Sequence, residues 1–135
     1  GRLPKARITV NEPLRKSILQ GGERMVRVDA AGKPSVSHLI QLQQFAEATL
    51  CEIAIETGRT HQIRVHTSHI GHAVAGDEKY GERAFNQRMR EFKLKRLFLH
   101  AARFEFEIGE KNFAFSAPLP PDLSRVVDAL QNRSS

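Results

Sequence analysis

The chain has 135 residues, 40% of them hydrophobic and 27% charged, which fits one globular domain or part of one and excludes wholesale disorder. It carries 21 Lys and Arg against 15 Asp and Glu, a net charge of +6, so nucleic acid is the favoured partner. The sequence contains no apolar run long enough to span a membrane, no signal-peptide pattern and a single cysteine, Cys51, so we expect a cytoplasmic protein without disulfides or a membrane partner.

Short β-like pieces dominate residues 1–35. The pieces at residues 7–10 and 25–28 are rich in β-branched or alternating apolar side chains. Turn-forming residues bracket them at 20–23 and 31–34. We therefore expect short strands separated by turns in this part of the chain.

Two longer strands follow and are predicted to form a hairpin. Residues 36–42 and 49–55 alternate in polarity and are separated by a short connection. In the second run Cys51, Ile53 and Ile55 fall on one face, which is typical of a sheet that is covered on one side.

Two helices are predicted in the middle of the chain. Helical spacing begins after residues 57–58, where Thr60 is placed to cap the first turn and Gly71 to end the helix. A second, strongly charged helix is expected over residues 82–96, with its phenylalanines and Met89 along one side.

A second hairpin and a final helix are predicted to close the chain. Residues 97–108 and 112–115 can pair across a turn at 109–111. Prolines and Asp122 then precede apolar residues at helical spacing, which indicates an amphipathic helix. Hairpins followed by isolated helices predict one α+β domain with a mainly antiparallel sheet and flanking helices.

The richest concentration of Arg, His and Gln lies in residues 56–66, where a strand is predicted to turn into a helix. Free N–H groups at such a junction suit anions. Arg64 is unusual there, because a cation in the first turn opposes the helix dipole, and its position indicates a carboxylate or phosphate partner. The alternative is that Arg59 and Arg64 merely lie on a solvated face.

Four histidines, His61, His66, His69 and His72, fall within residues 61–72, and a zinc site is one interpretation. No acid or thiol completes the ligand set, and the H-E-x-x-H pattern is absent. We therefore expect no metal, and interpret these histidines as packing residues or as hydrogen-bonding partners of the backbone or of RNA phosphates.

Asp77 lies in a glycine-bounded turn soon after this arginine-rich segment. Turn propensity alone explains an aspartate there, and we interpret it as one that binds its own backbone. The region that follows has an excess of positive charge, which fits either a solvated face or a groove that attracts phosphates. Its cations are Lys79, Arg83, Arg88, Arg90, Lys93, Lys95 and Arg96.

A set of ordered motifs matches a known family. Residues 57–66 read T-G-R-T-H-Q-I-R-V-H, and they are followed by G-H at 71–72, G-D at 76–77, K-Y-G at 79–81 and R-L-F-L-H-A at 96–101. In this order and spacing the chain resembles the RluA-type pseudouridine synthases of ribosomal RNA, and above all the large-subunit members. Shorter motifs extend the resemblance over nearly the whole chain.

The resemblance implies the pseudouridine synthase catalytic fold and the isomerisation of uridines, in 23S ribosomal RNA for the large-subunit members, without a cofactor. It also implies two supporting roles. Arg64 matches the arginine that pairs with the family's nucleophilic aspartate, and Leu99 matches a leucine that lines the uracil pocket. RNA contacts are expected from Arg59, Thr60, His61, His66, Lys79, Arg83, Arg88, Lys93, Lys95 and Arg96.

The chain departs from the family in what it lacks. The nucleophilic aspartate lies in an upstream segment reading approximately H-R-L-D-x-x-T-S-G, which does not occur here, and the catalytic tyrosine lies upstream too, so Tyr80 does not inherit its role. We expect residues 1–135 to be the C-terminal portion of a catalytic domain, inactive alone. Its exposed sheet edge would bind the missing upstream part or a second copy. The alternative is a non-catalytic RNA-binding module.

Overall fold

Antiparallel strands and flanking helices build the molecule. The computed structural model describes residues 1–18, 24–101, 103–108 and 111–134. Every strand pair within those ranges is antiparallel, so the predicted α+β class is confirmed. In chain order the elements are β1 (Arg7–Asn11), β2 (Leu14–Ile18), β3 (Arg24–Val28), β4 (Val36–Gln44), β5 (Thr49–Ile55), α1 (Gln62–His69), α2 (Arg83–Arg90), β6 (Arg103–Ile108), β7 (Lys111–Ser116) and α3 (Pro121–Ser134).

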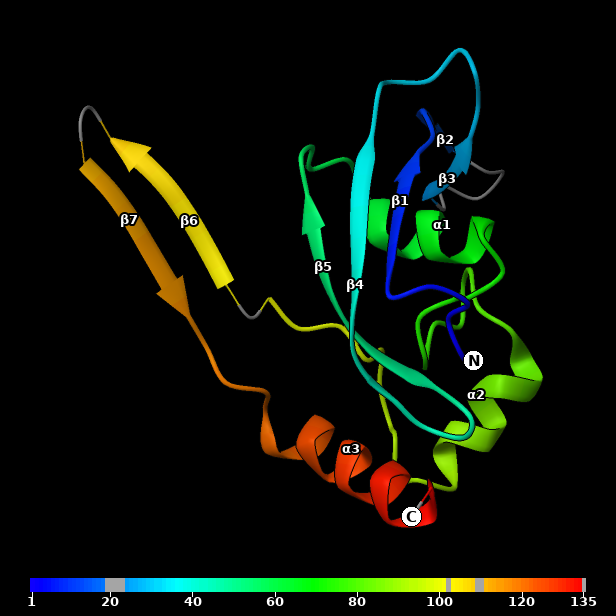
Figure 1. The fold of residues 1–135 in the computed structure, drawn as a ribbon. Helices are drawn as coiled ribbons and strands as arrows, with labels where there is room; N and C mark the ends of the chain where they lie inside the picture. Colours follow the sequence, from blue (N-terminus) through cyan, green and yellow to red (C-terminus); the bar gives the residue numbers. More distant parts are fainter. Residues whose placement is uncertain (19–23, 102, 109–110, 135) are drawn as a thin grey trace.

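A three-stranded sheet in the order β1-β4-β5 forms the centre of the molecule (Figure 1). The pairing of β4 with β5 confirms the predicted hairpin of two long strands. Cys51 and Ile53 share an apolar cluster with Leu39 of β4, as the alternation predicted. Ile55, at the end of β5, is exposed instead.

A β-bulge near the end of β4 was not predicted. The pairing register shifts between Gln41 and Gln43, which leaves Leu42 without a partner in β5 and 58% exposed. An extra residue bends a strand and changes which side chains face the core. Phe45, beyond the bulge, is buried in a second apolar cluster on α2 and α3.

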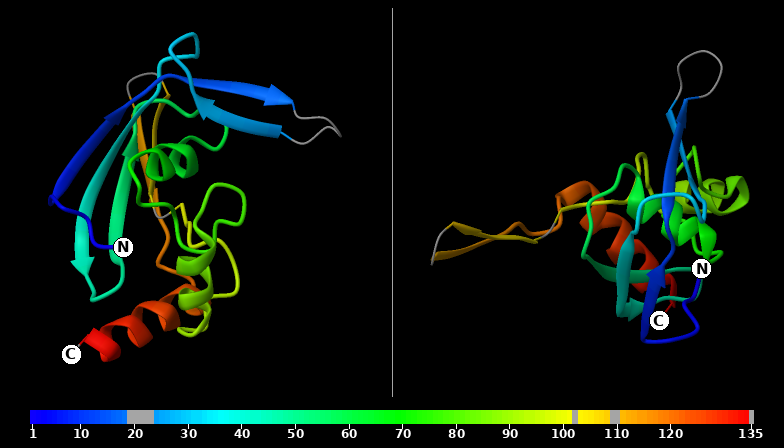
Figure 2. Two further views of the ribbon diagram at one scale, coloured as in Figure 1. Left: turned by 90° about the vertical axis from the view of Figure 1, so that its right-hand side faces the viewer. Right: turned by 90° about the horizontal axis from the view of Figure 1, so that it is seen from above.

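Helix α1 joins the central sheet to the β2–β3 hairpin. Val65 of α1, Leu14 of β2 and Val26 of β3 form a small buried cluster, and the hairpin extends beyond it (Figure 2, left). The sequence pattern predicted β3 but missed β2, because β2 begins L-R-K-S and lacks clean alternation. The turn predicted at residues 20–23 lies outside the described residues.

The largest apolar cluster holds α2 and α3 against the connection between β4 and β5, and the two helices lie together at one end of the molecule (Figure 2). Helix α2 is shorter than the predicted 82–96, since it ends at Arg90. Phe92 and Leu94 are both buried in the cluster, and residues two apart cannot face the same side of a helix. The chain therefore leaves the helix, with Lys93 in a left-handed conformation at φ 73°.

The β6–β7 hairpin extends away from the rest of the molecule in two perpendicular views (Figures 1 and 2). Its pairing confirms the predicted second hairpin, although residues 97–101 approach it as an extended connection rather than as a strand. The turn predicted at 109–111 falls largely outside the described residues. Helix α3 confirms the predicted amphipathic helix, with Leu123, Val126 and Leu130 buried, although Asp122 lies within its first turn rather than before it. No helix in the described part of the chain is long and apolar enough to cross a membrane.

Leu123→Ala tests the α2–α3 core. Leu123 is 0% exposed, so truncating it should lower the free energy of unfolding by about 2–5 kcal/mol through lost burial and a cavity. Urea denaturation measures the loss. Leu42→Ala is the matched control and should change stability by less than about 0.5 kcal/mol; equal losses in the two variants would contradict the assigned core.

Candidate functional site

The loop before α1 is fixed by the side chain of Gln62, which is buried. Its Oε1 accepts hydrogen bonds from Thr57 Oγ1 at 2.7 Å and from the backbone N–H of Arg59 at 3.1 Å. Its Nε2 donates to Val36 O and to Ser37 Oγ, both at 2.9 Å. These bonds anchor the start of α1 to β4.

The predicted cap of α1 at Thr60 is wrong. The N-cap is His61, which has a left-handed backbone at φ 53° and makes no side-chain capping bond. Gln62 already ties the preceding loop to the helix, so a hydroxyl cap at Thr60 is not needed. Gly71, at φ 81° just after the helix, confirms the predicted end.

His66 is a structural residue, and its predicted contact with RNA is not supported. The side chain is 0% exposed, and its Nε2 lies 2.9 Å from Glu12 O. A carbonyl can only accept, so Nε2 carries the proton, and Nδ1 accepts from the Ser37 hydroxyl at 2.7 Å. Both ring nitrogens are used inside the protein. Among the described residues, no group of three or more His, Cys, Asp or Glu is arranged to hold a metal ion.

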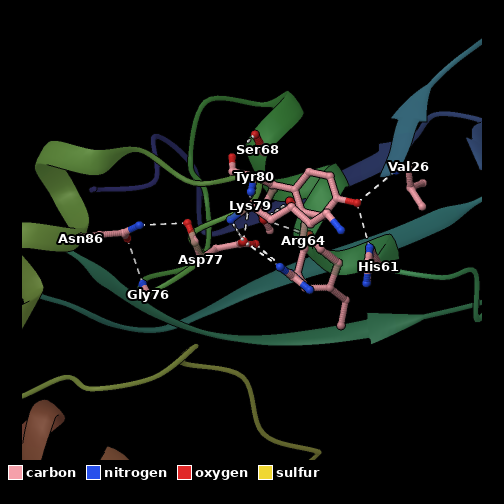
Figure 3. Close-up of polar contacts among 11 residues, drawn as sticks. Val26, His61, Arg64, Ser68, Gly76, Asp77, Lys79, Tyr80 and Asn86 are labelled. Carbon is pink, nitrogen blue, oxygen red and sulfur yellow. Dashed lines mark hydrogen bonds and ion pairs between the residues drawn. The ribbon is translucent and has the colours of Figure 1, made fainter. Parts of the chain in front are cut away.

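Arg64 forms a bidentate ion pair with Asp77. Arg64 Nε and Nη2 donate to the two carboxylate oxygens at 2.9 and 2.8 Å (Figure 3). The Asp77 side chain is 0% exposed and that of Arg64 is 20% exposed. The cation that opposes the helix dipole therefore has a carboxylate partner within the chain itself.

Asp77 is also the turn aspartate that the sequence predicted. Its Oδ1 accepts the backbone N–H groups of Lys79 and Tyr80, each at 3.0 Å. Burial by itself would raise the pKa of Asp77, but the hydrogen bonds from Arg64 and from these two N–H groups hold the pKa below its ordinary value. The hydrogen bond to Asp77 in turn raises the pKa of Arg64. The pair is therefore fully ionised at neutral pH.

Tyr80 holds Arg64 from a second direction. The guanidinium carbon of Arg64 lies 5.1 Å from the centre of the Tyr80 ring, within range of a cation–π contact. The Tyr80 hydroxyl accepts the N–H of Val26 at 3.0 Å and lies 2.8 Å from His61 Nδ1. Burial, together with the charges of Arg64 and Lys79, lowers the pKa of His61, so its unprotonated Nδ1 accepts a hydrogen bond from the Tyr80 hydroxyl. Tyr80 thus connects β3, α1 and the turn.

Asn86 of α2 secures the turn at residues 76–81. Its Oδ1 accepts the N–H of Gly76, and its Nδ2 donates to Asp77 O, both at 2.9 Å (Figure 3). Gly76 has φ 80°, and an added Cβ would lie 2.3 Å from Arg96 O, so only glycine fits. Sequence patterns did not single out Asn86. The one indication was that asparagine is a weak helix former, placed here within a charged helix.

An open cleft of about 470 Å³ lies beside this network. Arg64 lines its wall, whereas the buried Asp77 does not. Among the predicted RNA-binding residues, the structure brings Lys79, Lys95 and Arg96 to the same cleft. Arg90 and Glu78 line it as well. Arg64 is therefore grouped with several other cations around one cleft.

Leu99 does not line this cleft; Leu97 does. Leu99 is half-buried, and its N–H bonds to Leu97 O at 3.0 Å. Its role in a uracil pocket stays a prediction, because an upstream segment would have to complete that pocket.

The other predicted RNA-binding residues lie outside the cleft. Arg88 forms an ion pair with Glu47, through hydrogen bonds of 2.7 and 2.6 Å, and a second ion pair with Glu91. Arg59 is exposed and donates to Pro34 O at 3.1 Å. The remaining members are the exposed Arg83 and Lys93 and the half-buried Thr60 and His61.

Sequence comparisons point to one family. A family model described as RNA pseudouridylate synthase matches residues 4–69. Three curated relatives named ribosomal large subunit pseudouridine synthase C, from Pasteurella multocida, Salmonella typhimurium and Escherichia coli, are 43%, 47% and 45% identical to the chain. The alignments cover 92–93% of this chain but only 39–40% of each relative. The chain thus spans about two fifths of the length of these relatives.

Solved structures agree with the sequence matches. Human RNA pseudouridylate synthase domain containing 1 has a TM-score of 0.69 and 26% identity, over 97% of this chain and 62% of that one. Human RNA pseudouridylate synthase domain containing 4 also has a TM-score of 0.69, with 20% identity, over 93% of this chain and 57% of that one, a likeness of fold. The fold expected from the sequence motifs is confirmed.

Arg64→Ala should lower the free energy of unfolding, whereas removing an arginine with a purely functional role should not. Removing the guanidinium leaves Asp77 as a buried carboxylate with only backbone partners, at a cost of about 3 kcal/mol. Equilibrium urea unfolding at pH 7 measures this. Arg59→Ala, which removes an exposed arginine with one hydrogen bond, should cost less than about 1 kcal/mol. Comparable small losses in both variants would argue against the buried pair.

Asp77→Asn should make stability less sensitive to acid. Because the pKa of Asp77 is depressed in the folded state, its carboxylate stabilises the protein above the unfolded pKa of about 3.9. That contribution is lost as the pH falls through the lower folded value. Unfolding free energies measured from neutral pH down to about pH 3 should therefore fall more steeply for the wild type than for the variant. Parallel curves would show that Asp77 has an ordinary pKa.

Proposed function

We propose that the chain belongs to the RNA pseudouridine synthase family and is the C-terminal portion of an isomerase that converts uridine to pseudouridine in large-subunit ribosomal RNA. The proposal rests mainly on Arg64, a rigidly held arginine at the wall of a basic cleft. The names of the curated relatives supply the substrate class.

The geometry of Arg64 suits the role of an anion clamp. Asp77 binds the side-on edge of the guanidinium through Nε and Nη2. The end-on pair of N–H groups, on Nη1 and Nη2, is left for a second oxyanion, because arginine presents five N–H donors in a fixed fork. We propose that this oxyanion is the nucleophilic aspartate of the upstream segment. A fixed counter-charge keeps such a carboxylate ionised in a partly desolvated site.

The cations around the cleft fit an RNA partner. Arg96 pairs with Asp122 at 2.7 Å and Arg90 lies 3.6 Å from Glu78, so part of the positive charge is already balanced. Lys95 adds exposed positive charge at the same wall, and the whole chain has a net charge of +6. We propose that this surface binds RNA phosphates in the cytoplasm without a cofactor or a membrane partner.

The proposed upstream part would also complete the sheet. In the described part of the chain β5 pairs only with β4, so its other edge is open to a further strand. We propose that the upstream part of the same enzyme occupies this edge, with self-association as the alternative. A non-catalytic RNA-binding module is the second candidate function, favoured by the absence of the aspartate motif from these 135 residues.

Parallel assays of binding and conversion test the proposal. Two proteins are compared: the 135-residue chain, and an extended protein that also contains the residues encoded upstream of it. Each is incubated with a large-subunit ribosomal RNA transcript. Filter binding measures affinity and chemical mapping measures pseudouridine. Both proteins should bind, with affinity that falls steeply as salt rises, and only the extended protein should convert uridine.

Two results would contradict the proposal. Conversion by the short chain alone would show that the nucleophile lies within it. If the extended protein bound RNA but converted no uridine, the second candidate, the RNA-binding module, would take its place.

A further inference from the structure

The charge of Asp77 would repel the second carboxylate that the proposed function brings to Arg64. Asp77 places a negative charge 2.8 Å from Arg64, the cation to which the proposed function assigns an incoming carboxylate. An Asp that only competed for Arg64 would weaken that clamp. Yet Asp77 is completely buried, and its carboxylate satisfies Arg64 and two backbone N–H groups at once. The two backbone hydrogen bonds are enough to close the turn. They do not explain why the same carboxylate also pairs with Arg64.

The contacts of Arg64 leave its side chain little freedom to rotate. Asp77 holds one edge of the guanidinium through two hydrogen bonds, and the guanidinium carbon lies over the Tyr80 ring at 5.1 Å from its centre. Both partners are themselves anchored, because Asn86 binds the backbone of the turn and Val26 binds the Tyr80 hydroxyl. Long arginine side chains lose rotamer entropy when they bind a ligand, and here that entropy is already lost in the folded protein.

We infer that Asp77 is a positioning residue, which aims the end-on N–H groups of Arg64 into the cleft where the nucleophilic carboxylate is bound. The inference rests on the proposed function. It deepens that function by assigning the geometry of the clamp to a residue that does not itself line the cleft. The gain comes from orientation, since a bidentate guanidinium–carboxylate pair requires the two planar groups to be aligned.

The two possible roles of Asp77 predict opposite shifts in a pH profile. If Asp77 positions Arg64, then Asp77→Asn releases the guanidinium, weakens its pairing with the nucleophile and raises the pKa of the nucleophile. The acid limb of kcat/KM then moves to higher pH. If Asp77 merely competes, its removal strengthens that pairing and the limb moves to lower pH. Besides Asp77, Arg64 faces Tyr80 and the nearby His61. The charged residues that line the same cleft are Glu78, Lys79, Arg90, Lys95 and Arg96, and all of these groups are unchanged in the variant.

The experiment uses the chain extended by its upstream coding sequence and a large-subunit ribosomal RNA transcript. For Asp77→Asn we expect kcat to fall about ten- to a hundredfold, as for other displaced catalytic groups, with KM for RNA nearly unchanged. The acid limb should rise by about one pH unit. The fraction folded is measured by circular dichroism, so that loss of fold is not counted as loss of rate.

Asp29→Asn is the matched control. Asp29 is also a turn aspartate, bound to the N–H of Ala31 at 2.9 Å and to Arg27 at 3.3 Å, but it does not contact Arg64 or line the cleft. Its variant should keep the wild-type kcat and pH profile. If Asp77→Asn fails to fold, Arg64→Lys gives a second test, because it keeps the charge and loses the planar fork; its kcat should fall similarly.

The outcomes separate the inference from the function on which it rests. An acid limb that is unchanged or lower in Asp77→Asn, or a wild-type rate in Arg64→Lys, would overturn the positioning role while leaving the isomerase intact. A wild-type extended protein that forms no pseudouridine would instead overturn the proposed function.

Discussion

The ion pair between Arg64 and Asp77 is the interaction on which the rest of this structure depends. It joins the first turn of α1 to the turn before α2, two segments that share no strand pairing. A buried carboxylate is costly unless its lone pairs accept hydrogen bonds, and the groups around Asp77 meet that condition. Two backbone N–H groups donate hydrogen bonds to the Asp77 carboxylate beside those from Arg64. No buried side-chain polar atom among the described residues lacks a partner.

The packing of the molecule serves to hold that pair in place. The cluster of Leu14, Val26 and Val65 sets α1 against β3 and so places Tyr80 over Arg64. The larger cluster around Met89 and Leu123 sets α2, which brings Asn86 to the turn. Gln62 and His66 tie α1 to β4 and to the loop before β2. Asp77 and Tyr80 therefore hold the guanidinium of Arg64, and Arg64 lines a basic cleft.

Sequence patterns predicted most elements but only part of the site. Alternation predicted β5 with the observed bounds, because that strand has one covered face. The pattern overextended α2, since periodicity alone does not show that Phe92 and Leu94 must both be buried. The motif flagged both Arg64 and Asp77, yet not that they bind each other. Such a contact depends on where two turns meet in space, and Asn86 and the burial of His66 were hidden for the same reason.

Arginine side-chain NMR of the 135-residue chain, compared with that of Asp77→Asn, tests the central claim most directly. If Arg64 is held as described, its Nε–H signal exchanges slowly with water and shows restricted rotation about the Nε–Cζ bond, and both properties are lost in the variant. Contradiction would come from an Arg64 signal that is averaged and exchanges rapidly in the wild type, like that of the exposed Arg15.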